Sequence, residues 1–173
     1  MVFAAADVIL LGNQVTNNDF NGITVATLAS DRVFIRNNTI ANNTGIGIHF
    51  LHVAAVQPSP NRIEGNVVSA NLGGGIWIDW SWAPSIHQNN IVGNTGFGVK
   101  LTNMPVTLNA TNNWWGCPTG PNTTGCDTAI TDGKTSPQGN ATINYTPWLT
   151  APNAFAGSRV GLPTCMPLLV CDR

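Results

Sequence analysis

The stretch NNTIANNTGIGIHF, residues 37–50, sets two asparagine pairs ahead of a run of alternating apolar residues. Similar stretches recur along the chain, and aligning them gives steps of 25, 28, 23 and 23 residues between one set of asparagines: Asn13, Asn38, Asn66, Asn89 and Asn112. A second column follows five residues later, at Asn18, Asn43, Asn71 and Asn94. A period of this length indicates a repeated supersecondary unit, which decides the fold before any single segment does.

Each unit continues with a short alternating run, at residues 23–25, 46–50, 76–80 and 97–101. Alternation is typical of β-strands. A unit this short gains a continuous core only by stacking on copies of itself, and stacked coils ~4.8 Å apart allow repeated corner asparagines to hydrogen-bond as a ladder. The sequence therefore predicts an all-β parallel β-helix of about five coils, with Asn38, Asn66 and Asn89 buried at its corners.

Composition excludes several classes of partner. Charged residues make up 9% of the 173 residues and the net charge is −1, so we expect no nucleic-acid partner. No apolar run reaches the ~18 residues of a membrane span. The scattered acidic residues and the cysteine spacing predict neither a metal site nor a cofactor.

Four cysteines lie in the last third of the chain, in two close pairs. Proximity favours Cys117 with Cys126 and Cys165 with Cys171, although four cysteines allow three pairings. Disulfides persist in oxidising compartments, and six Asn-x-Thr sequons agree with export. The sequence thus predicts an extracellular or cell-surface protein.

Two further motifs carry a resemblance to a known family: NNWWGCPTGP at residues 112–121 and YTPWL at residues 145–149. Together with the repeats, they resemble the right-handed parallel β-helix proteins of the pectate-lyase-like superfamily, especially bacterial surface proteins that end in NWWG and PWL signatures. The resemblance implies a helix with its terminal coil over residues 1–149 and a C-terminal tail or cap over residues 150–173, stapled by the disulfides. It leaves activity open, because the superfamily includes lyases, hydrolases, epimerases and non-catalytic modules.

Stacking converts sequence alignment into spatial adjacency. With Val25, Ile48, Ile78 and Val99 pointing inward, the following residues predict one outward column: Ala26, His49, Asp79 and Lys100. The resemblance to polysaccharide lyases and epimerases makes Lys100 or His49 a candidate base for removing a proton next to a uronate carboxylate, with Asp79 beside it. The alternative is a solvated ion pair of little energetic consequence.

A neighbouring column of Thr24, Gly47, Trp77 and Gly98 predicts an indole on an open face. Exposed aromatic rings stack on sugars, so the candidate ligand site comprises Trp77, His49, Asp79, Lys100 and Trp82. The alternative is that residues 77–82 form a local hydrophobic cover. Trp80 is expected to point inward, while Trp114, at the position of Ile91, joins Trp115 and Trp148 in closing the C-terminal end.

The sequence favours a non-catalytic extracellular module, a scaffold or surface-display domain that can bind polysaccharide. An enzyme acting on acidic polysaccharide is the first alternative. The second is a structural subunit that associates end to end, since the edge around residues 8–10 has no predicted cap. In a longer chain, upstream coils would occupy that edge instead.

Overall fold

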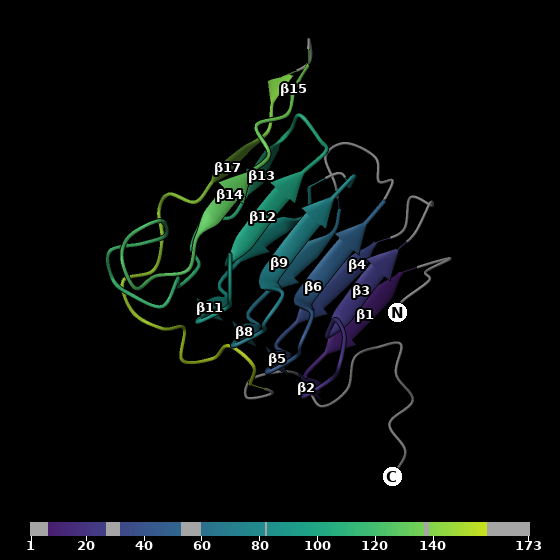
Figure 1. Ribbon diagram of the computed structural model, residues 1–173. Helices are drawn as coiled ribbons and strands as arrows, with labels where there is room; N and C mark the ends of the chain where they lie inside the picture. Colours follow the sequence, from purple (N-terminus) through teal and green to yellow (C-terminus); the bar gives the residue numbers. More distant parts are fainter. Residues whose placement is uncertain (1–6, 27–31, 53–59, 82, 137–138, 159–173) are drawn as a thin grey trace.

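The computed structural model describes residues 7–26, 32–52, 60–81, 83–136 and 139–158. In these residues all regular structure is β-strand, and no helix is present that could cross a membrane (Figure 1).

Most of the strands form three parallel sheets. The members of sheet 1 are β1 (Val8–Leu11), β4 (Val33–Arg36), β7 (Arg62–Glu64) and β10 (Ser85–His87). The members of sheet 2 are β2 (Gln14–Thr16), β5 (Thr39–Ala41), β8 (Val67–Ser69) and β11 (Asn90–Val92). The members of sheet 3 are β3 (Ile23–Ala26), β6 (Ile46–Leu51), β9 (Gly74–Asp79), β12 (Val99–Thr102) and β14 (Ala129–Thr131).

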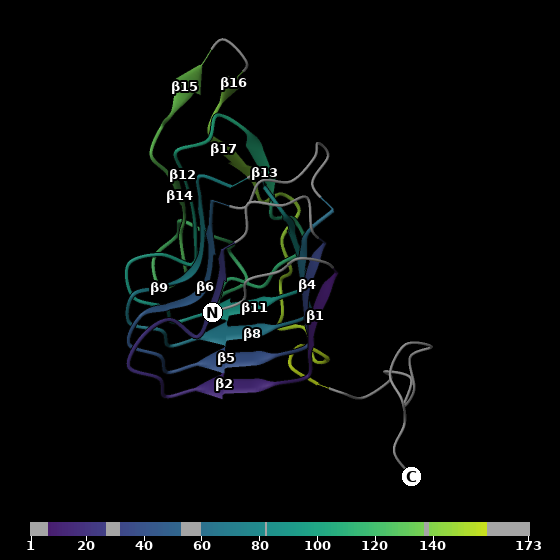
Figure 2. The ribbon, with the colours of Figure 1, turned by 90° about the vertical axis from the view of Figure 1, so that its right-hand side faces the viewer.

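Consecutive strands visit the three sheets in turn, so each set of three makes one coil of a parallel β-helix (Figure 2). The strands β1 to β12 make complete coils. A further, partial coil consists of β13 (Thr107–Asn109), an isolated bridge between Trp114 and Asn90, and β14. The predicted all-β solenoid is confirmed. Within this partial coil β13 pairs with β17 (Thr142–Asn144), and beyond it β15 (Thr135–Ser136) and β16 (Gly139–Asn140) form a projecting hairpin.

The core consists of stacked aliphatic and aromatic side chains from alternate strand positions. One inward column contains Val25, Phe50, Ile78 and Leu101, all fully buried. Their Cα atoms are paired from coil to coil, so each side chain lies directly on the next. Burial of such columns is the main favourable contribution to folding, because a single coil cannot shield its own apolar face.

One asparagine ladder runs along the corner between sheets 1 and 2. In each asparagine after the first, Oδ1 accepts hydrogen bonds from the backbone N and Nδ2 of the asparagine one coil earlier, at 2.8–3.0 Å. Its members are Asn13, Asn38, Asn66, Asn89 and Asn113. The predicted burial of Asn38, Asn66 and Asn89 is confirmed, since all three are inaccessible to solvent.

The last member corrects the sequence alignment, which placed Asn112 in this ladder. Asn112 instead has a φ of 56° and aligns with Gln88, whose backbone N donates to the Asn112 carbonyl at 2.8 Å. The residue before each ladder asparagine makes the corner and has a left-handed backbone. Asn112 therefore takes the corner, and Asn113 continues the ladder.

A second ladder, along the corner between sheets 2 and 3, joins Asn18, Asn43, Asn71 and Asn94. It ends at Asp127, whose carboxylate accepts from Asn94 Nδ2 at 2.7 Å and from the Gly93 backbone N at 2.8 Å. An ionised carboxylate can only accept hydrogen bonds, so it closes the series without a donor that would need a partner in a further coil.

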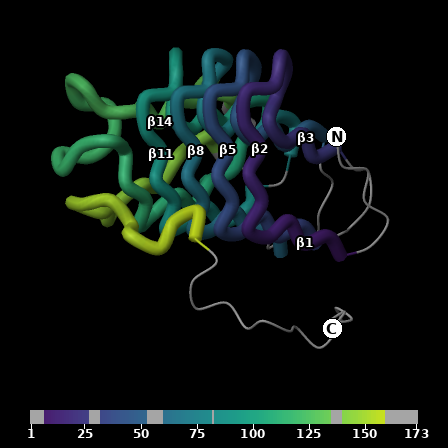
Figure 3. The backbone as a smooth tube through the Cα atoms, turned by 90° about the horizontal axis from the view of Figure 1, so that it is seen from below, coloured from purple at the N-terminus to yellow at the C-terminus, as the bar shows by residue number. Residues whose placement is uncertain are grey.

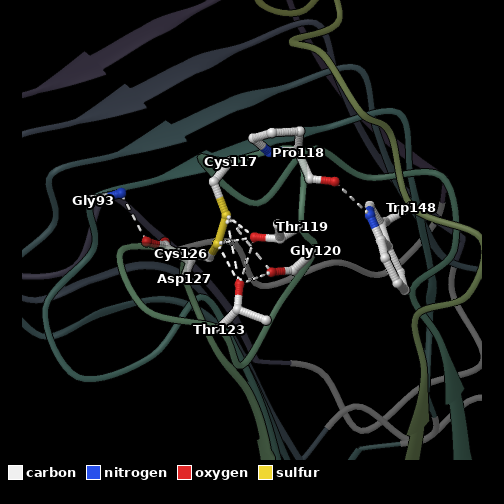
Figure 4. Close-up of a disulfide and its surroundings, with 9 residues drawn as sticks. All are labelled: Gly93, Cys117, Pro118, Thr119, Gly120, Thr123, Cys126, Asp127 and Trp148. Atoms are coloured by element: carbon white, nitrogen blue, oxygen red, sulfur yellow. Dashed lines mark hydrogen bonds between the residues drawn. A yellow bond between two sulfur atoms is a disulfide. The ribbon is translucent and has the colours of Figure 1, made fainter.

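Aromatic residues cover the C-terminal end of the helix, as predicted, but with a different tryptophan inside. Because Trp114 bridges to Asn90, Trp115 takes the inward position after Ile91, and its side chain is fully buried. Tyr145 contacts Trp115 edge-on at 6.5 Å between ring centroids. Trp148 lies 6.4 Å from Tyr145, and its Nε1 donates to the Pro118 carbonyl at 3.1 Å (Figure 4).

The predicted disulfide between Cys117 and Cys126 is present next to this cover, with its Cα atoms 5.5 Å apart (Figure 4). The predicted partners Cys165 and Cys171 lie outside the described residues. Residues 150–158 of the predicted tail are described, and the division of the chain at residue 149 stays a prediction.

Residues 149–158, called the strap below, run back from the cover along the corner between sheets 1 and 2 (Figure 3). Leu149 N donates to the Asn113 carbonyl at 2.9 Å, and Gly157 N donates to the Gly65 carbonyl at 2.8 Å. The strap thereby contacts corners of several successive coils.

Candidate functional site

The outward column on sheet 3 differs from the expected one. Strand pairing places Thr24, His49, Trp77 and Lys100 directly over one another. Asp79 belongs to the column two residues on, with Leu51 and Thr102. The expected columns Ala26, His49, Asp79, Lys100 and Thr24, Gly47, Trp77, Gly98 are therefore wrong in register, although the structure does bring His49, Trp77 and Lys100 together.

The side chains of this column form a continuous stack. The rings of His49 and Trp77 are nearly parallel, 8° apart, with their centroids separated by 4.6 Å. On the next coil, Lys100 Nζ lies 5.0 Å from the Trp77 centroid and 5.5 Å from that of Phe97. His49 and Lys100 come from the coils on either side of Trp77, so both faces of the indole are covered.

Asp79 is buried, with 9% of its surface accessible, whereas it was expected to be exposed. Its Oδ1 accepts hydrogen bonds from Thr102 Oγ1 at 2.6 Å and Asn103 Nδ2 at 2.7 Å. Thr102 Oγ1 in turn accepts from Trp77 Nε1 at 2.8 Å. The carboxylate thus anchors a hydrogen-bonded chain that fixes the orientation of the indole.

Burial dominates the electrostatics of His49. It lowers the pKa of the imidazole below its usual 6.5, and the negative charge of Asp79 offsets this only in part. Nε2 of His49 is buried and has no hydrogen-bond partner among the described residues, whereas Nδ1 lies 3.5 Å from Asn21 Nδ2. The imidazole is therefore neutral near pH 7 and is held as part of the stack.

Two tryptophans, Trp80 and Trp82, follow β9. Trp80 has a φ of 48° and is 51% exposed, so the expectation that it points inward is wrong. The left-handed turn at this residue ends the strand alternation and directs the ring outward. Trp82, the other expected ligand contact, lies outside the described residues.

Sheet 1 carries a column of ionisable side chains that the sequence analysis missed. Arg36, Glu64 and His87 are consecutive in the pairing of β4, β7 and β10. Glu64 lies 3.4 Å from Arg36 Nε and 4.0 Å from Arg62 Nε, so two guanidinium groups share one carboxylate. His87 Nδ1 is 2.9 Å from the Thr111 carbonyl oxygen.

A simple count would have found this column. Each of its members lies two residues before an asparagine of the first ladder: Asn38, Asn66 or Asn89. The alignment of the ladder therefore already placed the three side chains one above another on sheet 1. Together with the strap they line a surface cavity of about 370 Å³.

Potential metal ligands are dispersed among the described residues. In that part of the chain, no three side chains of His, Cys, Asp or Glu come together as a group that could hold a metal ion. Cys117 and Cys126 are oxidised and offer no thiolate.

Comparison with known proteins identifies the family of the chain. No curated protein and no solved structure is significantly similar to the chain. Residues 1–117, which include the complete coils, match the family model described as periplasmic copper-binding protein (NosD). The chain belongs to the NosD family.

Proposed function

We propose that the protein is a non-catalytic β-helix module that works outside the cytoplasm as a scaffold or display surface. The observation that carries this proposal is that neighbouring side chains hold the three candidate catalytic groups in place. These groups are His49, Asp79 and Lys100. The Cys117–Cys126 disulfide and the periplasmic description of the family support the location.

Each candidate group has a structural role that opposes catalysis. Removal of a substrate proton requires a basic atom that can approach the substrate. Nε2 of His49 is buried, the Asp79 carboxylate is bonded to Thr102 and Asn103, and Lys100 lies on the Trp77 ring. A lyase or epimerase would have to dismantle the stack to free a base.

Carbohydrate binding by Trp77 would need a different geometry from the expected one. Sugars stack on the face of an aromatic ring. His49 covers one face and Lys100 the other, so a glycan would meet only the edge of the half-buried indole. We therefore regard the stack as part of the scaffold, and any glycan as a ligand of another surface.

The family description names copper, but the described residues do not fit a resident copper ion. Copper sites in proteins are built from converging imidazole, thiolate and thioether groups. Here His49 is enclosed in the stack, His87 belongs to another sheet, and Cys117 is oxidised. No step of the proposed function involves a metal.

End-to-end association is also a weaker alternative. The first coil presents an unpaired edge formed by β1, β2 and β3 among the described strands, and such an edge can accept another strand. Repeated head-to-tail stacking would need a matching edge at the other end, which Trp115, Tyr145 and Trp148 cover. We expect a monomer when the molar mass is measured in solution by light scattering.

An ultraviolet assay for unsaturated uronate products tests the main proposal. The full chain is incubated with polygalacturonate and with alginate, with and without Ca²⁺, and no absorbance should develop. A Lys100→Ala variant and a His49→Phe variant serve as matched controls. Product formation by the unchanged protein that either variant abolishes would overturn the proposal and identify the base.

A further inference from the structure

A groove runs between the strap and the outer surface of sheet 1. Its volume is about 370 Å³. Its lining includes Arg36, Glu64 and His87 from sheet 1, the corner residues Asn37 and Gln88, and Phe155 from the strap. These side chains combine charge, hydrogen-bonding capacity and an aromatic surface in one place.

The charge of the groove favours an anion. Glu64 is the carboxylate partner of both Arg36 and Arg62, so this cluster of two cations and one anion retains a net positive charge. Arg36 remains about half exposed, and the planar guanidinium can donate two parallel hydrogen bonds to a carboxylate. Arg62 also donates to Ser85 Oγ at 2.8 Å, which leaves Arg36 as the cation that faces the groove.

The imidazole and amide groups of the groove suit hydroxyls. Because a carbonyl oxygen only accepts, the contact of His87 Nδ1 with the Thr111 carbonyl places a hydrogen on Nδ1. Nε2 is then the ring nitrogen that can contact a ligand hydroxyl. The side-chain amides of Asn37 and Gln88 supply further donors and acceptors at the same edge.

Phe155 adds an apolar surface. It is 68% exposed, which is unusual for a large apolar side chain. Its backbone N donates to Asn153 Oδ1 at 3.0 Å, and the backbone of Asn153 is bonded to the Asn90 side chain, so the ring belongs to a fixed part of the strap. An exposed ring beside polar groups can stack on the C–H face of a sugar.

We propose that this groove binds a hydroxylated carboxylate, the chemistry of a sugar acid. Arg36 receives the carboxylate, His87 and the corner amides bind hydroxyls, and Phe155 covers the apolar face of the sugar ring. The inference rests on the proposed function only in treating the module as a binding surface rather than an enzyme.

The test is an NMR titration of the full chain at low salt with D-galacturonate, D-galactose and acetate. Galacturonate should shift resonances of groove residues. Galactose lacks the charge and acetate lacks the hydroxyls, so each should bind at least about tenfold more weakly than galacturonate. Absence of galacturonate binding would refute the proposal. Equal affinity for galactose would refute the role of Arg36, and equal affinity for acetate would refute recognition of a sugar.

Variants localise the binding. Arg36→Gln should reduce the affinity for galacturonate to that for galactose, and Phe155→Ala should weaken the binding of both sugars. Arg32→Gln is the matched control, because Arg32 is exposed and pairs with Asp7 away from the groove. Unchanged affinity in both groove variants would contradict the site. Product in the lyase assay would instead contradict the non-catalytic role, so the two failures are distinguishable.

Discussion

At the scale of single residues, neighbouring asparagines have different tasks. Asn37 and Asn42 adopt φ values of 53° and 57° and turn the chain. Asn38 and Asn43, which follow them, are buried and extend the ladders. A paired asparagine thus supplies a left-handed corner and then a stacked amide, which explains why Asn-Asn recurs at the corners.

Asn66 is a fully buried member in the middle of the first ladder, and its replacement should be costly. Its side chain donates to the Ile35 carbonyl at 2.8 Å and accepts from Asn38, all in a fully buried environment. Asn66→Ala leaves these groups without partners and should lower the free energy of unfolding by about 1–3 kcal/mol. Urea denaturation measures this change. Asn13→Ala, at the exposed start of the same ladder, should cost clearly less, and an equal cost would contradict the ladder's role.

His49 should make stability depend on pH. Burial holds its folded-state pKa below 6.5, so the unfolded chain binds the proton more readily. As pH falls below 6.5 towards the folded-state value, His49 therefore lowers the free energy of unfolding. His49→Phe preserves an aromatic ring against Trp77 without a titrating group. The stability of the unchanged protein relative to this variant should decline on acidification, as measured by urea denaturation at several pH values, and a constant difference would refute the shift.

At the scale of strands, the sequence predicted the inward and outward faces better than the register. In sheet 3, the alignment of Ile48 with Ile78 was wrong by two residues, since Ile48 pairs with Ile76. A shift of two keeps every side chain on its proper face, so the apolar pattern cannot reveal it. The second asparagine column could have revealed the shift. The position six residues after each of its members gives one outward column, and this column contains Thr24, His49, Trp77 and Lys100.

The groove illustrates what periodicity can and cannot supply. The column of Arg36, Glu64 and His87 follows from the first ladder. The strap has no repeat, and its position depends on pairwise contacts such as Asn153 with Asn90 across 63 residues. A pattern within the coils therefore predicts the wall of the groove, but the contribution of Phe155 needs the three-dimensional structure.

Asp127, which ends the second ladder, should show the opposite pH dependence to His49. Burial raises its pKa above the usual 3.8, although hydrogen bonds from Asn94 and Gly93 moderate the shift. The folded state then binds the proton more readily, so the contribution of Asp127 to stability improves as pH falls through its raised pKa towards 3.8. Asp127→Asn removes this titration. Denaturation of both proteins across this range should show the unchanged protein gaining relative to Asp127→Asn, and a relative loss would contradict the prediction.

At the scale of the whole molecule, the two ends of the solenoid differ. Trp115, Tyr145 and Trp148 cover the last coil, whereas β1, β2 and β3 form an edge of their sheets. In a solenoid each coil contacts only its neighbours, so long-range cohesion is weak by default. The strap alters this, because its bonds to Asn113, Asn90 and Gly65 join three coils directly.

Asn90 is the side chain through which the strap is held most firmly. Its Oδ1 accepts from Asn153 N at 2.8 Å, and its Nδ2 donates to the Asn153 carbonyl at 2.9 Å. Asn90→Ala removes both bonds, so local opening of the strap should become more frequent while the coils remain folded. Limited proteolysis should therefore cleave within residues 149–158 about tenfold faster, since the loss of roughly 1.4 kcal/mol raises the open population by that factor.

The matched control is Asp19→Ala, an exposed residue at the corner between sheets 2 and 3, whereas the strap follows the corner between sheets 1 and 2. It should leave the cleavage rate unchanged. The same opening displaces Phe155, so Asn90→Ala should also weaken galacturonate binding even though Asn90 lies outside the groove lining. Faster cleavage with unaltered binding would show that the strap and the groove are independent, whereas an unaltered cleavage rate would show that its other contacts hold the strap in place.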